Sequence, residues 1–291
     1  MAFSDYVQLM KLRIAALLLL VAAAGYVTTS RLQVDPWSFS ILMVSGLLAA
    51  GGASALNHYA DRDVDARMRR TAGRPLPQHR IDPPARALEF GLALSGLALG
   101  LAFLGINGLT AAMIGLGIAF YIGVYTLALK RTHPSNIVIG GFAGSCPALA
   151  GSAAAAGVIS LPAALLALLV FLWTPGHFWV LAYRTRDDYR RVGIPMLPAV
   201  LDERSTVRAI AGSTALVPVA TFAFLLTPSF GLAFLGVAAV AGAVLLLRTA
   251  RFIRRPSMET ALDGYKFSGL YLTLILAGAM LDAVLAIRIL P

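Results

Sequence analysis

An ordered stripe of polar residues closes the second apolar stretch of the sequence. Asn57, Asp61 and Asp65 are spaced four residues apart, so on a helix they share one face, with neighbours about 6 Å apart. Two carboxylates on one stripe repel each other, and a divalent cation removes that conflict. Mg²⁺ prefers one or two carboxylates completed by water and phosphate oxygens, and an amide oxygen is a further neutral ligand. We therefore predict that this first acidic cluster (Asn57, Asp61 and Asp65) binds a metal ion.

Arginines follow the first acidic cluster directly, and Arg70 and Arg74 are among them. Guanidinium groups offer forked donors that suit phosphate oxygens. Carboxylates that hold a cation, followed by guanidinium groups, are suited to bind a magnesium diphosphate. The alternative is a solvated loop stabilised by ion pairs between helical neighbours, such as Asp65 and Arg69.

A second acidic cluster, Asp187 and Asp188, has the same arrangement. It ends another apolar stretch and is followed by Arg190 and Arg191. If the two acidic helix ends lie on the same side of one bundle, they can share one metal–diphosphate site. Asp187 and Arg191 are then substrate-binding candidates. The alternative is two independent loops, each with its own ion pairs.

The composition indicates how these clusters are positioned. Hydrophobic residues make up 58% of the 291-residue chain and charged residues only 13%, against about 25% charged in a soluble domain. A polytopic membrane protein is therefore predicted. The single cysteine, Cys146, excludes an intrachain disulfide and a cysteine-based metal cluster. The net charge of +10 is attributed to membrane orientation, and no nucleic-acid partner is expected.

Nine apolar segments approach the roughly 20 residues that cross a bilayer as a helix. We predict an all-α fold, a bundle of nine transmembrane helices that forms a single domain over residues 1–291. The predicted spans are 12–30, 38–57, 88–106, 109–129, 136–156, 161–183, 208–227, 231–248 and 267–289.

The connections between the predicted spans fall into two classes. Short links with turn residues alternate with longer basic segments, and only Arg31 and Arg288 among the Lys and Arg residues fall on the side of the short links. Positive residues mark the cytoplasmic side of a membrane protein. We therefore expect the N-terminus and both acidic clusters to face the cytoplasm.

The motif at 57–65, N-x-x-x-D-x-x-x-D, resembles the first aspartate motif of the UbiA superfamily of intramembrane prenyltransferases. Three stretches are similar to its heme-farnesylating branch: "DARMRRTAGRPLP" (65–77), "YTLALKRTHPSNIVIGGFAGSCPALAG" (125–151) and "HFWVLAYRTRDDYRRVGIPMLP" (177–198). The resemblance covers nearly the whole chain, because the spans and the order of the loops agree.

This resemblance implies an enzyme of the bacterial cell (inner) membrane with its active site on the cytoplasmic side. It implies that the enzyme uses Mg²⁺ to ionise farnesyl diphosphate and adds the farnesyl group to a vinyl group of heme B, after which water completes a hydroxyethylfarnesyl side chain. Besides these substrates and the lipid bilayer, the partners it suggests are heme A synthase and assembly factors of terminal oxidases.

By position, the resemblance makes Asp61 and Asp65 catalytic residues, with Asn57 as a third metal ligand. Asp188 corresponds to the aspartate of the second motif, as a catalytic residue and metal ligand. Tyr183, a further catalytic candidate, stands where the first carboxylate of that motif is expected if Asp187 is the second. This departure puts a complete second metal site in doubt.

Further candidates each have a simpler interpretation. Tyr125 could line the wall around an allylic cation or could be a membrane-interface aromatic residue. Lys130 and Arg131 could bind heme propionates or diphosphate, or could anchor at lipid headgroups. Asn136 is a substrate-binding candidate by the resemblance and also a candidate helix cap. His177 is either a heme contact, including an axial ligand of the iron, or a hydrogen-bonded packing residue.

Three other functions compete with this interpretation. The same fold could prenylate another acceptor, such as an aromatic acid or a quinone or chlorophyll precursor. A transporter would carry ionisable residues near the bilayer midplane, whereas the acidic residues here gather at helix ends. A non-catalytic scaffold would tolerate loss of Asp61 and Asp65.

Overall fold

The computed structural model describes residues 2–31, 33–224 and 230–285 of the chain, and this part is helical apart from the connections, of which 68–84 is a long one. The helices are α1 (Phe3–Leu9), α2 (Leu12–Ser30), α3 (Pro36–Arg67), α4 (Ala85–Gly105), α5 (Gly108–Ala119), the π-helix η1 (Phe120–Leu129), α6 (Asn136–Gly140), α7 (Phe142–Ala156), α8 (Leu161–Arg184), α9 (Arg186–Arg191), α10 (Leu197–Val200), α11 (Glu203–Phe224), α12 (Leu232–Arg254) and α13 (Met258–Leu285).

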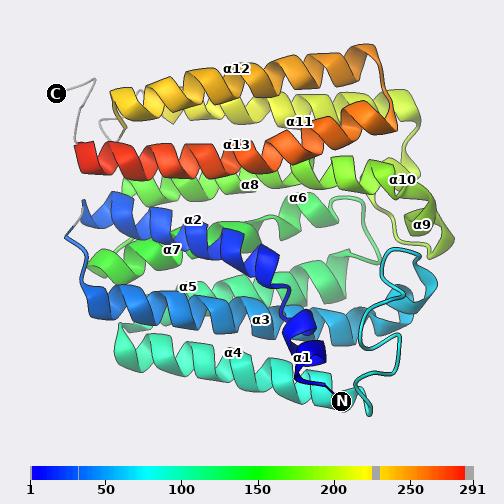
Figure 1. The fold of residues 1–291 in the computed structure, drawn as a ribbon, viewed down its shortest axis with the longest axis horizontal. Helices are drawn as coiled ribbons and strands as arrows, with labels where there is room; N and C mark the ends of the chain where they lie inside the picture. The colour runs from blue at the N-terminus through cyan, green and yellow to red at the C-terminus, as the bar shows by residue number, and fades with distance from the viewer. Residues whose placement is uncertain (1, 32, 225–229, 286–291) are drawn as a thin grey trace.

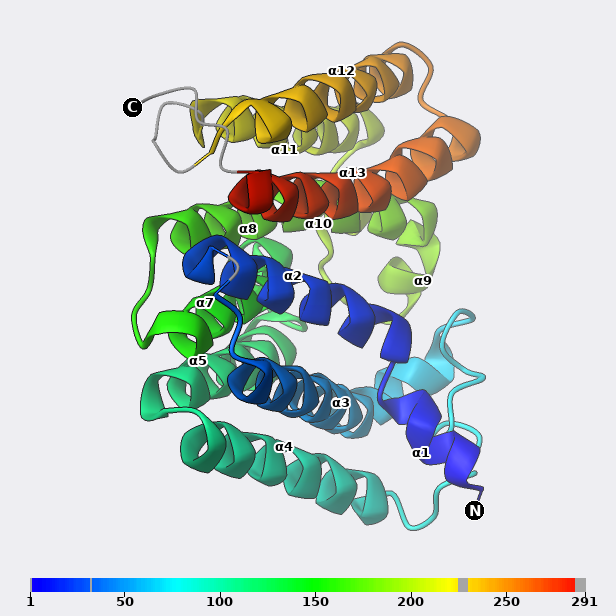
Figure 2. The same cartoon turned by 60° about the vertical axis from the view of Figure 1, so that its left-hand side comes forward.

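The long helices lie side by side with their axes roughly aligned (Figure 1). The closest neighbours are α3 and α4, α2 and α7, and α12 and α13. The connections that follow α3, η1, α9 and α12 lie at one end of the bundle, together with α1 and α9 (Figures 1 and 2). We call this the basic end, because its connections, together with the helix ends beside them, carry most of the Lys and Arg residues of the sequence.

Polar caps terminate the helices at the opposite end of the bundle. The Asp35 carboxylate accepts hydrogen bonds from the N–H groups of Trp37 and Ser38, and Asn107 caps α5 through Thr110 N–H at 2.8 Å. Such caps satisfy donors that the first helical turn leaves unpaired. The short links therefore contain polar residues between the apolar runs, because these residues cap the helices that follow.

Helices α2 and α7 touch through glycine. A Cβ atom on Gly25 would lie 2.1 Å from the Ala148 carbonyl oxygen, and one on Gly151 would lie 2.1 Å from that of Ala22. Close backbone contact through small residues is how helices pack in membranes, where lipid gives no hydrophobic drive for association. This contact fixes the position of α2, which bounds the site described below.

The predicted fold class is confirmed, with a difference in the number of spans. Eight helical segments of the described chain are long and apolar enough to cross a membrane. The predicted span 208–227 corresponds to α11, which packs against α8 and α12 but is not among those eight. Residues 225–227 of that span and 286–289 of the last one lie outside the described residues.

Helix α3 continues well beyond the predicted end of its span at residue 57. It runs to Arg67, so its last turns project to the basic end and carry the whole first acidic cluster on one helix. The loop after α3 is fastened to the N-terminal helix, because Arg80 forms an ion pair with Asp5 of α1. The fold thereby orders the segment that contains Arg70 and Arg74.

Candidate active site at the basic end of the bundle

The first acidic cluster is buried on one face of α3. Asp61 is 0% exposed, Asp65 3% and Asn57 4%. The Asn57 amide donates to Asp61 Oδ2 at 2.7 Å, so neighbouring members of the stripe are in contact, as their spacing predicts. The Asp63 side chain is 54% exposed instead, because it projects from another side of the helix.

Each member of the first acidic cluster contacts a basic side chain from a different segment. Lys11 Nζ donates to Asn57 Oδ1 at 3.1 Å, Lys130 forms an ion pair with Asp61, and Arg74 Nη1 lies 2.6 Å from Asp65 Oδ2. The partner of Asp65 is therefore Arg74 rather than Arg69, and the arrangement differs from a solvated loop with local pairs.

Lys11 immediately precedes α2 and lies among these charges. Burial, reinforced by the positive charges of Arg74 and Lys130, lowers the pKa of Lys11 to about 7, although Asp65 and Asp61 oppose this shift. The two carboxylates favour the charged form of Lys11, while its direct contact is with the amide oxygen of Asn57.

The basic pair after η1 divides between two carboxylates. Lys130 contacts buried Asp61, whereas Arg131 forms a short pair with exposed Asp63 at 2.7 Å and lies 3.9 Å from Asp61 Oδ1. The hydrogen bonds that Arg131 donates to Asp63 raise the pKa of Arg131. The structure thus brings Lys130 into the cluster and places Arg131 at its exposed edge.

The second acidic cluster lies at the same end of the bundle, on the short helix α9 (Figure 1). Asp188 is 9% exposed and pairs with Arg191 at 3.3 Å. The Asp187 side chain is 82% exposed and pairs loosely with Arg190 at 3.7 Å. Only Asp188 is therefore buried close to the core.

Tyr189 connects α9 with the first cluster. It is 2% exposed and packs in one hydrophobic cluster with Val64 and Met68. Burial raises the pKa of Tyr189, while the neighbouring charge of Arg70 acts in the opposite direction. The Tyr189 hydroxyl is therefore a neutral group that accepts a hydrogen bond from Arg70, which follows the first acidic cluster.

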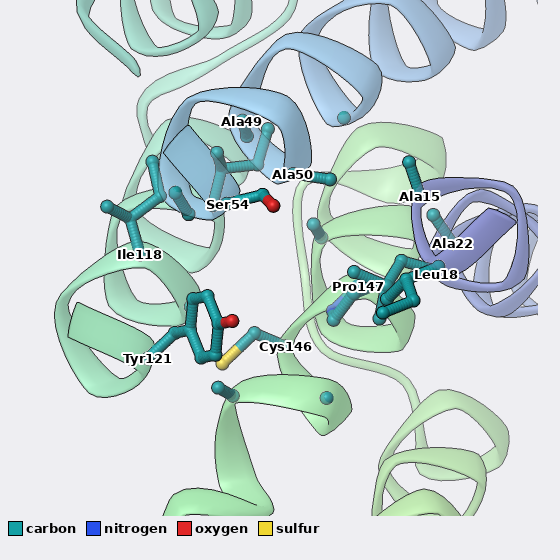
Figure 3. A pocket seen from close by; sticks show the side chains of 18 of the residues that line it. Ala15, Leu18, Ala22, Ala49, Ala50, Ser54, Ile118, Tyr121, Cys146 and Pro147 are labelled. Carbon is teal, nitrogen blue, oxygen red and sulfur yellow. The ribbon is translucent and has the colours of Figure 1, made fainter. Parts of the chain in front are cut away.

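An apolar cavity of about 350 Å³ begins beside the first acidic cluster and extends into the bundle. Figure 3 shows side chains of α2 (Ala15 and Leu18), α3 (Ala50 and Ser54) and Cys146 of α7 facing this space. Lys11 and Tyr125 line the cavity as well. Lys11 also contacts Asn57 of the first acidic cluster, and the Tyr125 ring lies beside Lys130, the partner of Asp61.

The far end of the cavity is lined by Ala22, Leu42, Ile114 and Ala150. On α3 the lining runs from Ser54 to Leu42, which corresponds to about 18 Å of helix at 1.5 Å per residue. The space is thus long and apolar, with its polar groups gathered beside the first acidic cluster.

Two tyrosines of η1 form the aromatic wall of the cavity. The rings of Tyr121 and Tyr125 stack at 5.8 Å with an interplanar angle of 7°. A Cβ atom on Gly140 would lie 2.7 Å from the Tyr125 ring, so the glycine permits the ring to pack there. Lys130 Nζ lies 5.8 Å from the centre of the same ring.

Two candidates lie apart from this cavity. The His177 ring is stacked between Trp173 at 4.1 Å and Tyr265 at 4.4 Å, with Nδ1 3.3 Å from Ser268 Oγ. The Tyr183 hydroxyl donates to Glu203 at 2.7 Å. Both side chains therefore interact with α11 or α13 and not with the first acidic cluster.

Asn136 begins α6 and is 0% exposed. Neither polar atom of its side chain has a hydrogen-bond partner. Burying an amide without a hydrogen-bond partner costs free energy of folding. The Asn136 side chain does not cap α6, whose N-cap residue is Ser135. The helix-cap alternative is therefore not observed, and a binding role for Asn136 stays a prediction.

Lys11, Thr126 and Tyr189 belong to the site, although sequence reasoning did not assign them to it. Thr126 Oγ1 lies 3.2 Å from the Asn57 amide nitrogen. The available signal for Lys11 was its place at the start of a span on the same side as Asn57. Thr126 and Tyr189 lie beside polar groups only because distant segments meet.

The oxygens of the first acidic cluster are of the kind that Mg²⁺ takes. Asp61 Oδ1 is buried and accepts no hydrogen bond, so one carboxylate oxygen is available. In the described part of the chain, no three His, Cys, Asp or Glu side chains gather into a metal site. Asn57, Asp61 and Asp65 can therefore hold such a cation when the oxygens of a bound diphosphate complete its shell.

Known proteins share both the sequence and the fold. The chain is 41% identical to protoheme IX farnesyltransferase 1 of Cenarchaeum symbiosum, with 97% of each chain covered. It is 42% identical to protoheme IX farnesyltransferase of Pyrobaculum arsenaticum, with 96% of this chain and 100% of that one covered.

Solved structures of lower sequence identity have the same fold. A digeranylgeranylglyceryl phosphate synthase matches with a TM-score of 0.79 at 20% identity, over 97% of this chain and 98% of that one. A UbiA homologue from Archaeoglobus fulgidus bound to GPP and Mg²⁺ matches with a TM-score of 0.68 at 16% identity, over 94% and 99%.

The model of the UbiA prenyltransferase family matches residues 18–275. This range contains the first acidic cluster, most of the cavity lining and the second acidic cluster. With its eight apolar helical segments, the chain is an integral membrane protein, and it belongs to the UbiA prenyltransferase family.

Proposed function

We propose that this enzyme transfers the farnesyl group of farnesyl diphosphate to a vinyl group of heme B within the membrane. The observation that carries the proposal is the apolar cavity of about 350 Å³ beside the buried, cation-paired first acidic cluster. The names of the relatives at 41% and 42% identity support this choice of donor and acceptor.

The donor lies with its farnesyl tail in the cavity and its diphosphate at the basic end. Lys11, Lys130 and Arg74 are already directed at the first acidic cluster. They can move from the Asn57 amide and the two carboxylates to the phosphate oxygens by small changes of side-chain conformation. Arg70 adds a guanidinium group from the same loop.

Asn57, Asp61 and Asp65 would hold Mg²⁺, which when bound stabilises the negative charge that develops on the departing diphosphate. The homologue from Archaeoglobus fulgidus that is bound to GPP and Mg²⁺ supports Mg²⁺ as the cation. Asp188 is the candidate for an additional contact from the second acidic cluster, with Arg191 as its partner. Asp187 and Arg131 serve as charges at the exposed rim.

The reaction breaks the allylic C–O bond, and the electron pair leaves with the diphosphate. The vinyl π electrons then form the new C–C bond, and water captures the resulting cation and releases a proton. The stacked rings of Tyr121 and Tyr125 provide a π surface for the allylic cation. The apolar lining excludes water from the reacting carbon until the vinyl group attacks.

Topology and domain structure complete the proposal. The basic end faces the cytoplasm of a bacterial inner membrane, because positive residues remain on that side. Residues 1–291 act as one domain. Heme A synthase and assembly factors of terminal oxidases are the partners that would take up the farnesylated heme.

The test is an assay of the purified full chain in detergent with farnesyl diphosphate, Mg²⁺ and either heme B or 4-hydroxybenzoate. Mass spectrometry is expected to find hydroxyethylfarnesyl heme and unchanged benzoate, and no product in the presence of EDTA. A prenylated benzoate with unchanged heme would refute the acceptor. Product formation at the same rate in EDTA would refute the metal assignment.

A further inference from the structure

Thr126 is buried where the π-helix η1 meets α3. It is 2% exposed, and its hydroxyl takes part in two hydrogen bonds. Oγ1 donates to the Tyr121 carbonyl oxygen at 2.8 Å, and it lies 3.2 Å from the amide nitrogen of Asn57. A hydroxyl has a single proton, so a Thr126 that donates to Tyr121 can only accept from Asn57.

This arrangement fixes which way round the Asn57 amide lies. Amide oxygen and nitrogen are distinguished by their hydrogen-bond partners. The Asn57 nitrogen faces two acceptors, Thr126 Oγ1 at 3.2 Å and Asp61 Oδ2 at 2.7 Å. The Asn57 oxygen consequently faces the opposite direction, toward the ammonium group of Lys11 at 3.1 Å.

The π-helix supplies the geometry that Thr126 needs. In η1 the turns are wider, so residues five apart follow one another on one face, as the bond from Lys130 N–H to the Tyr125 carbonyl at 2.8 Å shows. Thr126 and Tyr121 are such a pair. π-Helical turns are rare and occur often at functional sites.

We infer that Thr126 is a positioning residue that keeps the Asn57 amide oxygen, rather than its nitrogen, on the side where Lys11 now lies, so that this oxygen can ligate the cation once Lys11 moves to the phosphates. The inference rests on the proposed function, in which Asn57 is a metal ligand. Only the oxygen of an amide can ligate Mg²⁺. A reversed amide would present N–H donors to the cation and leave the carboxylate of Asp61 facing an oxygen.

The test uses Mn²⁺, a paramagnetic substitute for Mg²⁺, and measures its binding to the purified full chain by electron paramagnetic resonance. Farnesyl thiolodiphosphate, a slowly ionising donor analogue, is present throughout. Loss of groups that orient a metal ligand typically weakens metal binding about 10–100-fold, and we expect Thr126→Val to weaken Mn²⁺ binding by about tenfold or more. Thr126→Ser keeps the hydroxyl and should remain within about threefold of the parent.

Two further comparisons separate orientation from a general structural effect. Thr249→Val removes a hydroxyl that also donates to a helical carbonyl, that of Leu245, in α12, and it should leave Mn²⁺ binding unchanged. In an Asn57→Ala background there is no amide to orient, so Thr126→Val should add no further loss.

The outcomes are distinct. Parental Mn²⁺ affinity in Thr126→Val, failure of Thr126→Ser to preserve binding, or an additive loss in the Asn57→Ala background would overturn the inference. If Thr126→Val does not yield folded protein by thermal unfolding, Thr126→Ala carries the same expectation. A parent chain that binds no Mn²⁺ would instead refute the proposed metal site itself.

Discussion

The two acidic clusters look alike in the sequence and differ in the structure. The first lies within the long helix α3, is buried, and has basic partners from three separate segments. The second lies on the six-residue helix α9, and its carboxylates pair with arginines of the same helix, three residues away. The same sequence pattern, acidic residues followed by arginines, therefore occurs in two different structural environments.

The difference arises from helix length and from neighbours. A long helix keeps residues four apart on one face, so a stripe can be buried as a unit. Because α9 has fewer than two turns, Asp187 and Asp188 point in different directions, one to solvent and one inward. Long-range partners thus distinguish a binding cluster from a local ion pair.

Among the substitutions that compare the two clusters, Asp61→Asn should lower enzyme activity most. The substitution keeps the shape of the side chain but removes the charge at the most buried position of the first acidic cluster. We expect product formation to fall about 10³-fold, as for loss of one main electrostatic contact in a transition state. The measurement is the rate of heme farnesylation by purified enzyme.

The matched control is Asp63→Asn, two residues away on the same helix. Its carboxylate is exposed and pairs with Arg131, so activity should remain within about threefold of the parent. Equal losses in both variants would show that charge near the helix end matters and burial does not.

The second acidic cluster provides its own internal comparison. Asp188→Asn alters the buried carboxylate, and we expect about a 10–100-fold loss of activity, the range for groups that support a metal ligand. Asp187→Asn alters an exposed side chain and should cost less than about threefold. If both variants kept full activity, the second cluster would have no role in the reaction.

Lys11 tests whether the first acidic cluster needs partners from outside its own segment. Lys11→Ala should raise the dissociation constant of farnesyl diphosphate about tenfold, because a hydrogen bond to a charged group contributes about 1.5 kcal/mol. Lys11→Arg keeps the charge and should recover most of that affinity. Unchanged affinity in Lys11→Ala would show that Lys11 does not bind the diphosphate, which would then be bound by Arg70 and Arg74 of the loop after α3 and by Lys130 after η1.

Asp202, in the connection between α10 and α11, should give the smallest effect. Its exposed carboxylate accepts from the Ser205 hydroxyl and from Ser205 N–H at 2.9 Å, and these hydrogen bonds lower the pKa of Asp202. Stability from this contact is present above the unfolded pKa of about 3.9 and is lost as the pH falls through the lower folded value. Asp202→Ala should therefore lower Tm slightly at pH 7, with no difference from the parent in strong acid and no change in activity at pH 7.

The fold was largely predictable because apolar periodicity and length carry most of the signal. The predicted span 12–30 coincides with α2, and 161–183 falls one residue short of α8. The predicted end of the second span was wrong, since α3 continues to Arg67. Charged residues ended the apolar run, whereas the helix itself is continued by contacts at the basic end.

The site was predictable where the relation between residues is local. The spacing of Asn57, Asp61 and Asp65 indicates a shared face without further information. The pairing of Lys11 with Asn57 is a tertiary contact between residues 46 positions apart, and no local pattern encodes it. The sequence likewise did not indicate which neighbouring helix His177 faces, because a helix that is apolar on all sides has no polar face to orient it.

The pairing of each carboxylate and the amide with a cation has a consequence for the end of the catalytic cycle. When the freed diphosphate leaves with its metal, Lys11, Lys130 and Arg74 have internal acceptors to which they can return. Product departure then leaves no isolated charge in a poorly hydrated place, where such a charge would be expensive. The same contacts that compete with the incoming donor therefore speed the release of the spent anion, a step that limits turnover in many enzymes.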